Sequence, residues 1–163
     1  MAFWKESTAE PKRKYRFLIT NGEEKGWWWA TTAALPSYSI NESTYRLGNH
    51  NHKYPGTVTW NDIEIIIVDD SERAKDLYAS LIRGGYYPDG NGFDGMGRFG
   101  LQEGLLSGDN FRISSLKANG DVLETWVLNK PWIKSADFGQ LDYSSDDLVT
   151  IALTICYDNA ILE

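Results

Sequence analysis

The chain has 163 residues, of which 42% are hydrophobic, and it carries a formal net charge of −7 at pH 7. This length and composition are typical of one domain with a genuine hydrophobic core, so we expect a single domain over residues 1–163. The acidic balance argues against sequence-specific DNA binding through the body of the domain, because such a surface repels phosphate. The one cysteine, Cys156, excludes an internal disulfide.

The sequence shows no segment that directs it into a membrane. The N-terminus lacks the apolar core of a signal peptide, and no run approaches the roughly 20 apolar residues that cross a bilayer. We therefore expect a protein that is made in the cytoplasm and does not insert into a membrane.

The N-terminal part is predicted to combine an arm with short strands. Residues 1–14 carry a basic run and no clear hydrophobic period, so we interpret them as an extended arm that a partner orders. A strand is predicted over 15–19 and a turn over 21–26. The triplet at 27–29 places indoles on both faces of an extended run, and a core can take only one face. We expect the other face to meet a second sheet or another subunit.

The next segment is predicted to be a short strand, a loop and a turn that lead into a core strand. We expect a strand over 37–40 and a loop over 45–52. Pro55-Gly56 is a turn signal, since proline presets one backbone angle and glycine tolerates positive φ. Beyond Asn61-Asp62 the apolar alternation moves to Ile63, Ile65 and Ile67, and this change of parity indicates a turn or bulge.

One helix is predicted, beginning near Ser71 as its cap. Asp69 and Asp70 precede it, where negative charge favours the positive end of the helix dipole. The apolar residues have the spacing of one buried stripe, and Gly84-Gly85 ends the helix. The stripe consists of Ala74, Leu77, Tyr78, Leu81 and Ile82.

Residues 84–110 are predicted to form a long glycine-rich loop, with nine glycines in 27 positions. A loop of this length inside a compact domain is seldom passive. We favour packing on an adjacent subunit, and a lid over an active site or folding back on its own domain remain alternatives.

The C-terminal part is predicted to be an antiparallel meander. Strands over 111–117 and 122–128 flank Asn119-Gly120, which is a strong hairpin signal. A strand over 132–138 follows, and the strand over 149–158 alternates large apolar with small side chains. The chain is thus predicted to be mainly antiparallel β with one flanking helix.

No residue pattern indicates chemistry, so we predict a protein that is not an enzyme and has no catalytic residues, no metal and no cofactor. His50 and His52 lack further ligands near them in sequence. The carboxylate pairs at 69–70 and 146–147 are interpreted as helix or turn caps, because neighbours on a strand point apart. A nucleophile elbow is absent, and the glycines at 90–97 do not follow a strand and open a helix.

Two runs carry a family resemblance. NHNHKYPG at 49–56 with Trp60, and LDYSSDD at 141–147 leading to ICYDNA at 155–160, resemble the tail tube proteins of contractile-tailed (myovirus-type) bacteriophages. Those proteins are similar to the tube subunits of secretion systems and pyocins. The resemblance implies a two-sheet sandwich or small barrel with the helix at its side.

The same resemblance implies a structural role. Subunits would form hexameric rings that stack into a tube, in which acidic residues facing the bore leave double-stranded DNA mobile, without sequence-specific contact. The tail sheath, baseplate and terminator proteins would be further partners. The location would be the virion tail, assembled in the host cytoplasm. Residues 53–60 and the long loop would make contacts within or between rings. The aromatic and proline residues that we expect at subunit contacts are Phe3, Trp4, Trp27, Trp28, Trp29, Tyr54, Pro55, Trp60, Tyr86, Tyr87, Phe93 and Phe99.

Two other functions stay open on the sequence. Seven tryptophans and nine tyrosines would suit a carbohydrate-binding β-sandwich, with the triplet at 27–29 as a stacking platform. A tube initiator or terminator, or the tube subunit of a secretion system, would have the same ancestry and another place in the assembly.

Overall fold

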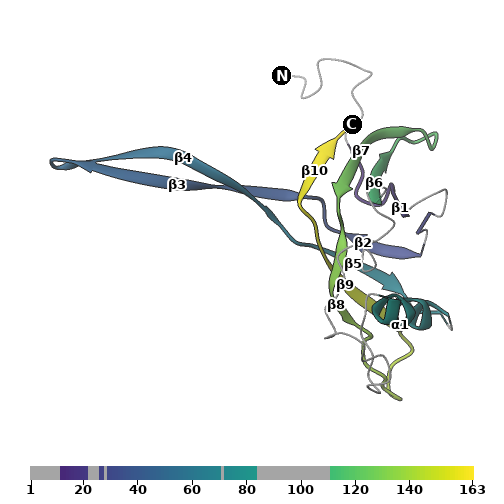
Figure 1. The fold of residues 1–163 in the computed structure, drawn as a ribbon. Coiled ribbons are helices and arrows are strands. Elements are labelled where there is room, and N and C mark those ends of the chain that lie inside the picture. The colour runs from purple at the N-terminus through teal and green to yellow at the C-terminus, as the bar shows by residue number, and fades with distance from the viewer. Residues whose placement is uncertain (1–11, 22–25, 28, 71, 84–110) are drawn as a thin grey trace.

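The structure is a computed structural model, and it describes residues 12–21, 26–27, 29–70, 72–83 and 111–163. In these residues the chain forms ten strands and one helix, with the strands antiparallel throughout (Figure 1). The elements are β1 (Phe17–Asn21), β2 (Ala30–Ala33), β3 (Ser37–Leu47), β4 (His50–Asn61), β5 (Ile63–Val68), α1 (Arg73–Arg83), β6 (Phe111–Leu116), β7 (Val122–Asn129), β8 (Trp132–Asp137), β9 (Thr150–Cys156) and β10 (Asn159–Leu162).

Two four-stranded sheets form the body. One has the order β1-β6-β7-β10 and the other β2-β5-β9-β8, while β3 and β4 pair only with each other. The prediction of a mainly antiparallel β protein with one helix is therefore confirmed. No helix in the described residues is long and apolar enough to span a bilayer.

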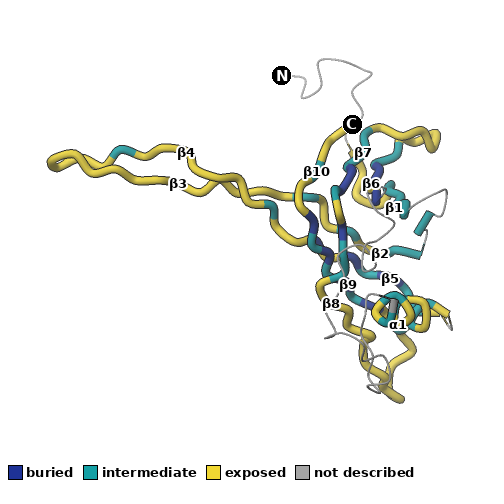
Figure 2. The backbone as a smooth tube through the Cα atoms, viewed as in Figure 1, coloured by how far each residue is buried: buried dark blue, intermediate teal, exposed yellow. Residues whose placement is uncertain are grey.

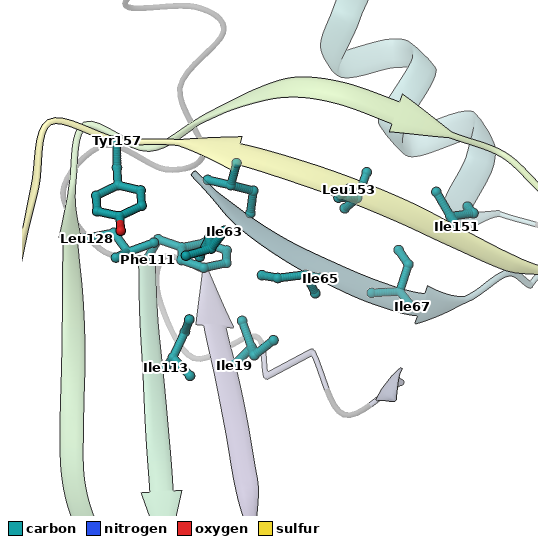
Figure 3. Packing of buried hydrophobic residues seen from close by; sticks show 11 residues of the cluster. Ile19, Ile63, Ile65, Ile67, Phe111, Ile113, Leu128, Ile151, Leu153 and Tyr157 are labelled. Atoms are coloured by element: carbon teal, nitrogen blue, oxygen red, sulfur yellow. The ribbon is translucent and has the colours of Figure 1, made fainter. Parts of the chain in front are cut away.

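A single core joins the two sheets (Figure 3). On β5, Ile63, Ile65 and Ile67 are buried and alternate with less buried residues, as the sequence predicts. In the register of the sheet, Ile65 lies opposite Leu153 of β9, and both are fully buried. The first sheet contributes the buried side chains of Ile19, Phe111, Ile113 and Leu128 to the same cluster.

The hairpin between β6 and β7 turns where the sequence predicts. Gly120 has a φ of 89°, a conformation that glycine adopts without the steric penalty of a side chain. The amide of Lys117 donates to the carbonyl of Asp121, and the amide of Gly120 donates to the carbonyl of Lys117. These bonds close the turn in register with the strands.

The helix begins shortly after the acidic pair Asp69-Asp70, as the sequence predicts. The Asp70 carboxylate accepts hydrogen bonds from the amides of Glu72 (3.0 Å) and Arg73 (3.2 Å). These bonds hold the pKa of Asp70 below its ordinary value. Of the predicted stripe, Ala74 and Leu77 pack against the core, whereas Tyr78 and Leu81 are exposed. The predicted cap, Ser71, lies outside the described residues.

Two further predictions are wrong, and both fall in β3 and β4. Residues 45–52 are not a loop, because the two strands continue to Leu47 and resume at His50. Pro55-Gly56 is not a turn but lies inside β4, where Pro55 is opposite Glu42. Proline is tolerated in a strand at an edge or bulge, where its missing amide hydrogen is not needed. A tenth strand, β10, also follows the predicted last strand.

Candidate assembly interface

The hairpin of β3 and β4, residues 37–61, is the feature of this fold that is suited to contact another molecule. It extends far from the body, and its strands pair with no strand of either four-stranded sheet (Figure 1). Every residue of β3 is exposed, and in β4 only His52 and Trp60 are partly covered (Figure 2). We call these residues the long hairpin.

The base of the long hairpin is held firmly by the body. The Trp60 ring lies between Tyr38, at 5.4 Å between ring centroids, and the buried Tyr157, at 6.1 Å. Just beyond β4, Lys134 Nζ of β8 donates to Asp62 Oδ2 at 2.6 Å. These contacts fix the direction in which the hairpin leaves the body.

The ion pair at this base gives a pH-dependent prediction. The hydrogen bond from Lys134 holds the pKa of the Asp62 carboxyl below its ordinary value. A lowered folded-state pKa stabilises the fold above about pH 4, and this contribution disappears as the pH falls through the folded-state value. We expect Asp62→Asn to lower the thermal midpoint at pH 7 by at most about 4 °C, since the pair is largely exposed.

The check is a pair of thermal unfolding curves, measured by circular dichroism at pH 7 and in acid. The difference between wild type and Asp62→Asn should shrink as the pH falls below about 4 and through the lowered folded-state pKa, because the wild-type carboxyl is then protonated. A difference that persists unchanged in acid would contradict this origin.

A β-bulge divides the long hairpin into two halves. Ile40 pairs with Val58, and Glu42 pairs with Pro55. Between these two pairs β4 therefore has one residue more than β3. A Cβ atom on Gly56 would lie 2.7 Å from the carbonyl oxygen of Asn41, too close for any side chain. Glycine is thus required here by the close approach of the two strands.

The bulge moves the apolar side chains from one face of the hairpin to the other. In the half near the body, paired residues place Tyr38, Ile40, Val58 and Trp60 on one face. We call these four residues the proximal patch. The opposite face of this half is polar, and Asn41 Nδ2 donates to Thr57 Oγ1 there at 3.2 Å.

In the far half, the apolar residues of β3 are odd-numbered, so they lie on the face opposite Tyr38 and Ile40. The cross-strand pairs of this face define the distal patch: Ser43, Tyr45, Leu47, His50, His52 and Tyr54. His50 and His52 lie with ring centroids 4.7 Å apart, as two residues on one face should. The other face of the far half carries the ion pair of Lys53 with Glu42, at 3.0 Å.

Gly56→Ala should therefore disturb the long hairpin and leave the body intact. The added Cβ would push Asn41 away and disrupt the bulge that sets the two faces. We expect faster amide hydrogen exchange in residues 37–61 and unchanged exchange in β5 and β9, measured by mass spectrometry. Ser39→Ala is the matched control, since it changes an exposed residue of the same hairpin near the bulge without adding an atom. Equal exchange changes in hairpin and core would contradict the prediction.

The structure describes five of the twelve residues that the sequence places at subunit contacts. Tyr54 belongs to the distal patch, Trp60 to the proximal patch, and Pro55 lies at the bulge. Trp27 and Trp29 pack on the core of their own chain, with ring centroids 6.4 Å apart. Phe3, Trp4, Trp28, Tyr86, Tyr87, Phe93 and Phe99 lie outside the described residues, as do residues 1–11 of the predicted arm and the whole predicted loop at 84–110.

Sequence reasoning missed most of the distal patch. Tyr45, Leu47, His50 and His52 fell in the segment that it assigned to a loop. The signal for a strand was present, because Tyr45 and Leu47 are two residues apart and so are the histidines. Without the pairing of β3 and β4, four residues of mixed polarity did not distinguish an exposed strand from a loop.

A second candidate surface lies in the segment that connects β8 to β9. Its residues surround a hollow of about 730 Å³, lined by Gln140, Leu141, Asp142, Tyr143, Ser145, Asp147, Leu148 and Val149. Leu141 is 84% exposed and Tyr143 is fully exposed, so the apolar lining of the hollow has little cover. Asp142 Oδ1 accepts hydrogen bonds from the amide (2.9 Å) and hydroxyl (2.8 Å) of Ser144, which lower the pKa of Asp142. We call this hollow the 139–149 groove.

The described residues show no constellation that would support chemistry. Among them, no group of three or more His, Cys, Asp or Glu side chains is placed to hold a metal ion. Burial raises the pKa of the Cys156 thiol, so this cysteine is not an activated nucleophile. The exposed surfaces described above are therefore the candidates for function.

No protein-family model matches the chain, and no curated protein sequence matches it. Solved structures do. A chain in the structure of the anti-feeding prophage cap, a tube-terminating cap, is similar over 100% of this chain and 99% of its own, with a TM-score of 0.72 and 18% identity. The chain has the fold of contractile-system tube proteins.

Two further structures share this fold. A chain of the PVC sheath-tube complex of an extracellular contractile injection system has a TM-score of 0.72 and 18% identity, and the match covers 96% of this chain and 93% of that one. A type six secretion system protein has a TM-score of 0.53 and 6% identity, covering 91% and 82%. The predicted tail tube fold is thereby confirmed.

Proposed function

We propose that this chain is a structural subunit of a contractile tail tube, forming hexameric rings that stack around a channel. The observation that carries the proposal is the long hairpin, whose apolar side chains beyond its base are largely exposed. Tyr45 and Leu47 are 60% and 62% exposed, and Tyr54 is 56% exposed. Contiguous exposed apolar surface is characteristic of an interaction site, and a tube would cover it.

The edges of the two sheets support the same proposal. Among the strands of the described residues, β10 ends one sheet and β2 and β8 end the other with pairing on one side only, while β1 has just one further bridge, between Thr20 and Gly26. Such edges invite association with other strands, and closure into a ring removes this hazard. Copies of one chain arranged around an axis would satisfy these edges.

The charge of the chain is consistent with a conduit for nucleic acid. The net charge is −7. Carboxylates that face a bore would not retain DNA, because no counterions are released when DNA passes an anionic wall. We propose passage of double-stranded DNA through a bacteriophage tail, with the sheath, baseplate and terminator as partners and the virion as the location.

The deciding experiment is electron microscopy of the purified chain under polymerising conditions, with size-exclusion chromatography beforehand. Stacked rings with a central channel are the expected result. A stable monomer that is retained on polysaccharide would instead favour the carbohydrate-binding alternative. That alternative is weakened because Trp27 and Trp29 of its supposed platform pack on the core.

A tube terminator is the second candidate function. It is favoured by the similarity to a tube-terminating cap, whose TM-score of 0.72 equals that of the sheath-tube chain. A terminator would form single rings that do not stack, whereas a tube subunit would give long tubes. The lengths of the particles in the micrographs distinguish the two. Tubes bearing a secretion-system sheath, seen in native particles, would favour the remaining alternative.

A further inference from the structure

The two histidines of the chain lie next to each other on one face of the long hairpin, far from the body (Figure 1). His50 is the first residue of β4 and lies opposite Leu47, and His52 lies opposite Tyr45. Residues two apart on a strand point to the same side. Their ring centroids are accordingly 4.7 Å apart. All the imidazole groups of this sequence are thus gathered at one place on an exposed strand.

This spacing suits two ligands of one metal ion. Imidazole nitrogens lie about 2.0–2.1 Å from a zinc ion that they bind. Two rings in neighbouring coordination positions of such an ion therefore have centroids roughly 4.5–5.2 Å apart. The observed 4.7 Å falls within that range. Strand β4 thus holds the two rings at the separation that a shared ion requires.

The ring nitrogens of both residues are open to an ion. Within the described part of the chain, neither imidazole takes part in a hydrogen bond or an ion pair. His50 is exposed and His52 is only partly covered, so solvent reaches both. Arg46 and Lys53 lie on the opposite face, where Lys53 pairs with Glu42. The distal patch therefore has no lysine or arginine of its own that would repel a cation.

The pairing of β3 with β4 changes the expectation drawn from the sequence. That expectation, of no metal, rested on two histidines in a loop without further ligands. On a strand the two imidazoles act together, because an ion held by the first meets the second at a high effective concentration. The described residues add no third His, Cys, Asp or Glu ligand, so water would occupy the remaining coordination positions. The arrangement is an open site with two protein ligands.

We propose that His50 and His52 form a binding site for a divalent transition-metal ion, such as Ni²⁺, Cu²⁺ or Zn²⁺. Imidazole suits these ions, whereas Mg²⁺ and Ca²⁺ prefer oxygen ligands. A bound ion would add positive charge to a patch that contains no lysine, arginine, aspartate or glutamate. The site is independent of the proposed function, because one copy of the chain provides both ligands.

Isothermal titration calorimetry of the full-length chain with nickel chloride tests the site at pH 8, since histidine must be unprotonated to bind a metal. The test variant is His52→Gln with Lys53→His, which keeps two histidines but places them on opposite faces of the hairpin. Lys53→Gln is the matched control, because it also loses the ion pair with Glu42 but keeps His50 and His52. Circular dichroism checks that both variants fold.

We expect the test variant to bind Ni²⁺ at least tenfold more weakly than wild type, and Lys53→Gln to bind it as wild type does. Ni²⁺ should also protect both histidines from diethyl pyrocarbonate, as located by mass spectrometry, and Mg²⁺ should not. The site would be overturned if wild type does not bind Ni²⁺, if the test variant binds within tenfold of wild type, if Lys53→Gln loses as much, or if Ni²⁺ leaves the histidines unprotected. Electron micrographs decide the proposed function separately, so either proposal can fail without the other.

Discussion

Shortening the long hairpin is expected to abolish polymerisation while the body stays folded. The change replaces residues 44–53 with Asn-Gly, which joins Ser43 to Tyr54, a pair that already lies opposite in the register. Asn-Gly suits a two-residue hairpin turn and closes β6–β7 in this chain. Four residues of the distal patch are removed, so a tube held by that patch should not form. Sedimentation velocity and electron microscopy measure the loss.

The stability of the body should not change on this deletion, because none of the deleted residues belongs to the core cluster. We expect the thermal midpoint to stay within about 3 °C of wild type. Thr44→Ala with Asn51→Ala is the matched control, since it keeps the hairpin length and alters only the face opposite the distal patch. That control should polymerise normally. Tubes of normal length from the shortened chain would show that assembly does not need the hairpin.

Truncation in the shared core should have the largest effect on folding. Ile65→Ala is expected to lower the free energy of unfolding by about 3 kcal/mol, from lost burial and from the cavity left behind. Ile65 is fully buried and lies opposite the fully buried Leu153. Because domains of this kind are stable by only about 5–15 kcal/mol, the loss would be a large fraction of the total. Urea unfolding followed by tryptophan fluorescence measures it.

The control for the core variant comes from the same strand. Glu64 is exposed and points away from the core, so Glu64→Ala should change the unfolding free energy by less than about 0.5 kcal/mol. A loss below about 1 kcal/mol for Ile65→Ala would mean that the two sheets do not share the core described here. Both variants keep the long hairpin, so they separate stability from assembly.

The interface has a physical logic that differs from that of the body. In the body, each core strand buries one face, because a slip of the whole strand by one residue would turn its core side chains outward. In the long hairpin both faces are exposed, and the bulge at Gly56 uses this freedom to change the apolar face part-way along. The hairpin therefore presents apolar side chains in two opposite directions, with Trp60 at the base continuous with the core.

Prediction from sequence succeeded where burial of one strand face produces a regular alternation of apolar and polar residues. The alternation of β5 and β9 reflects one buried face, and Asn119-Gly120 reflects a turn whose backbone angles favour those residues. It failed between residues 45 and 56, where the predicted loop and turn are strand. There the strands are solvent-exposed, so only a short alternation such as Tyr45 with Leu47 marks them, and the turn propensity of Pro55-Gly56 was overridden by the pairing of Pro55 with Glu42.

The sequence by itself determined a mainly β chain, its two core strands, the β6–β7 turn and the resemblance to tail tube proteins, because each depends on neighbouring residues. Only the tertiary structure decided that β1 pairs with β6, that Lys134 meets Asp62, and that the distal patch faces away from the proximal one. Those facts depend on pairing between distant segments. Local preferences do not encode such pairing, because the free energy that selects it comes from packing the whole core.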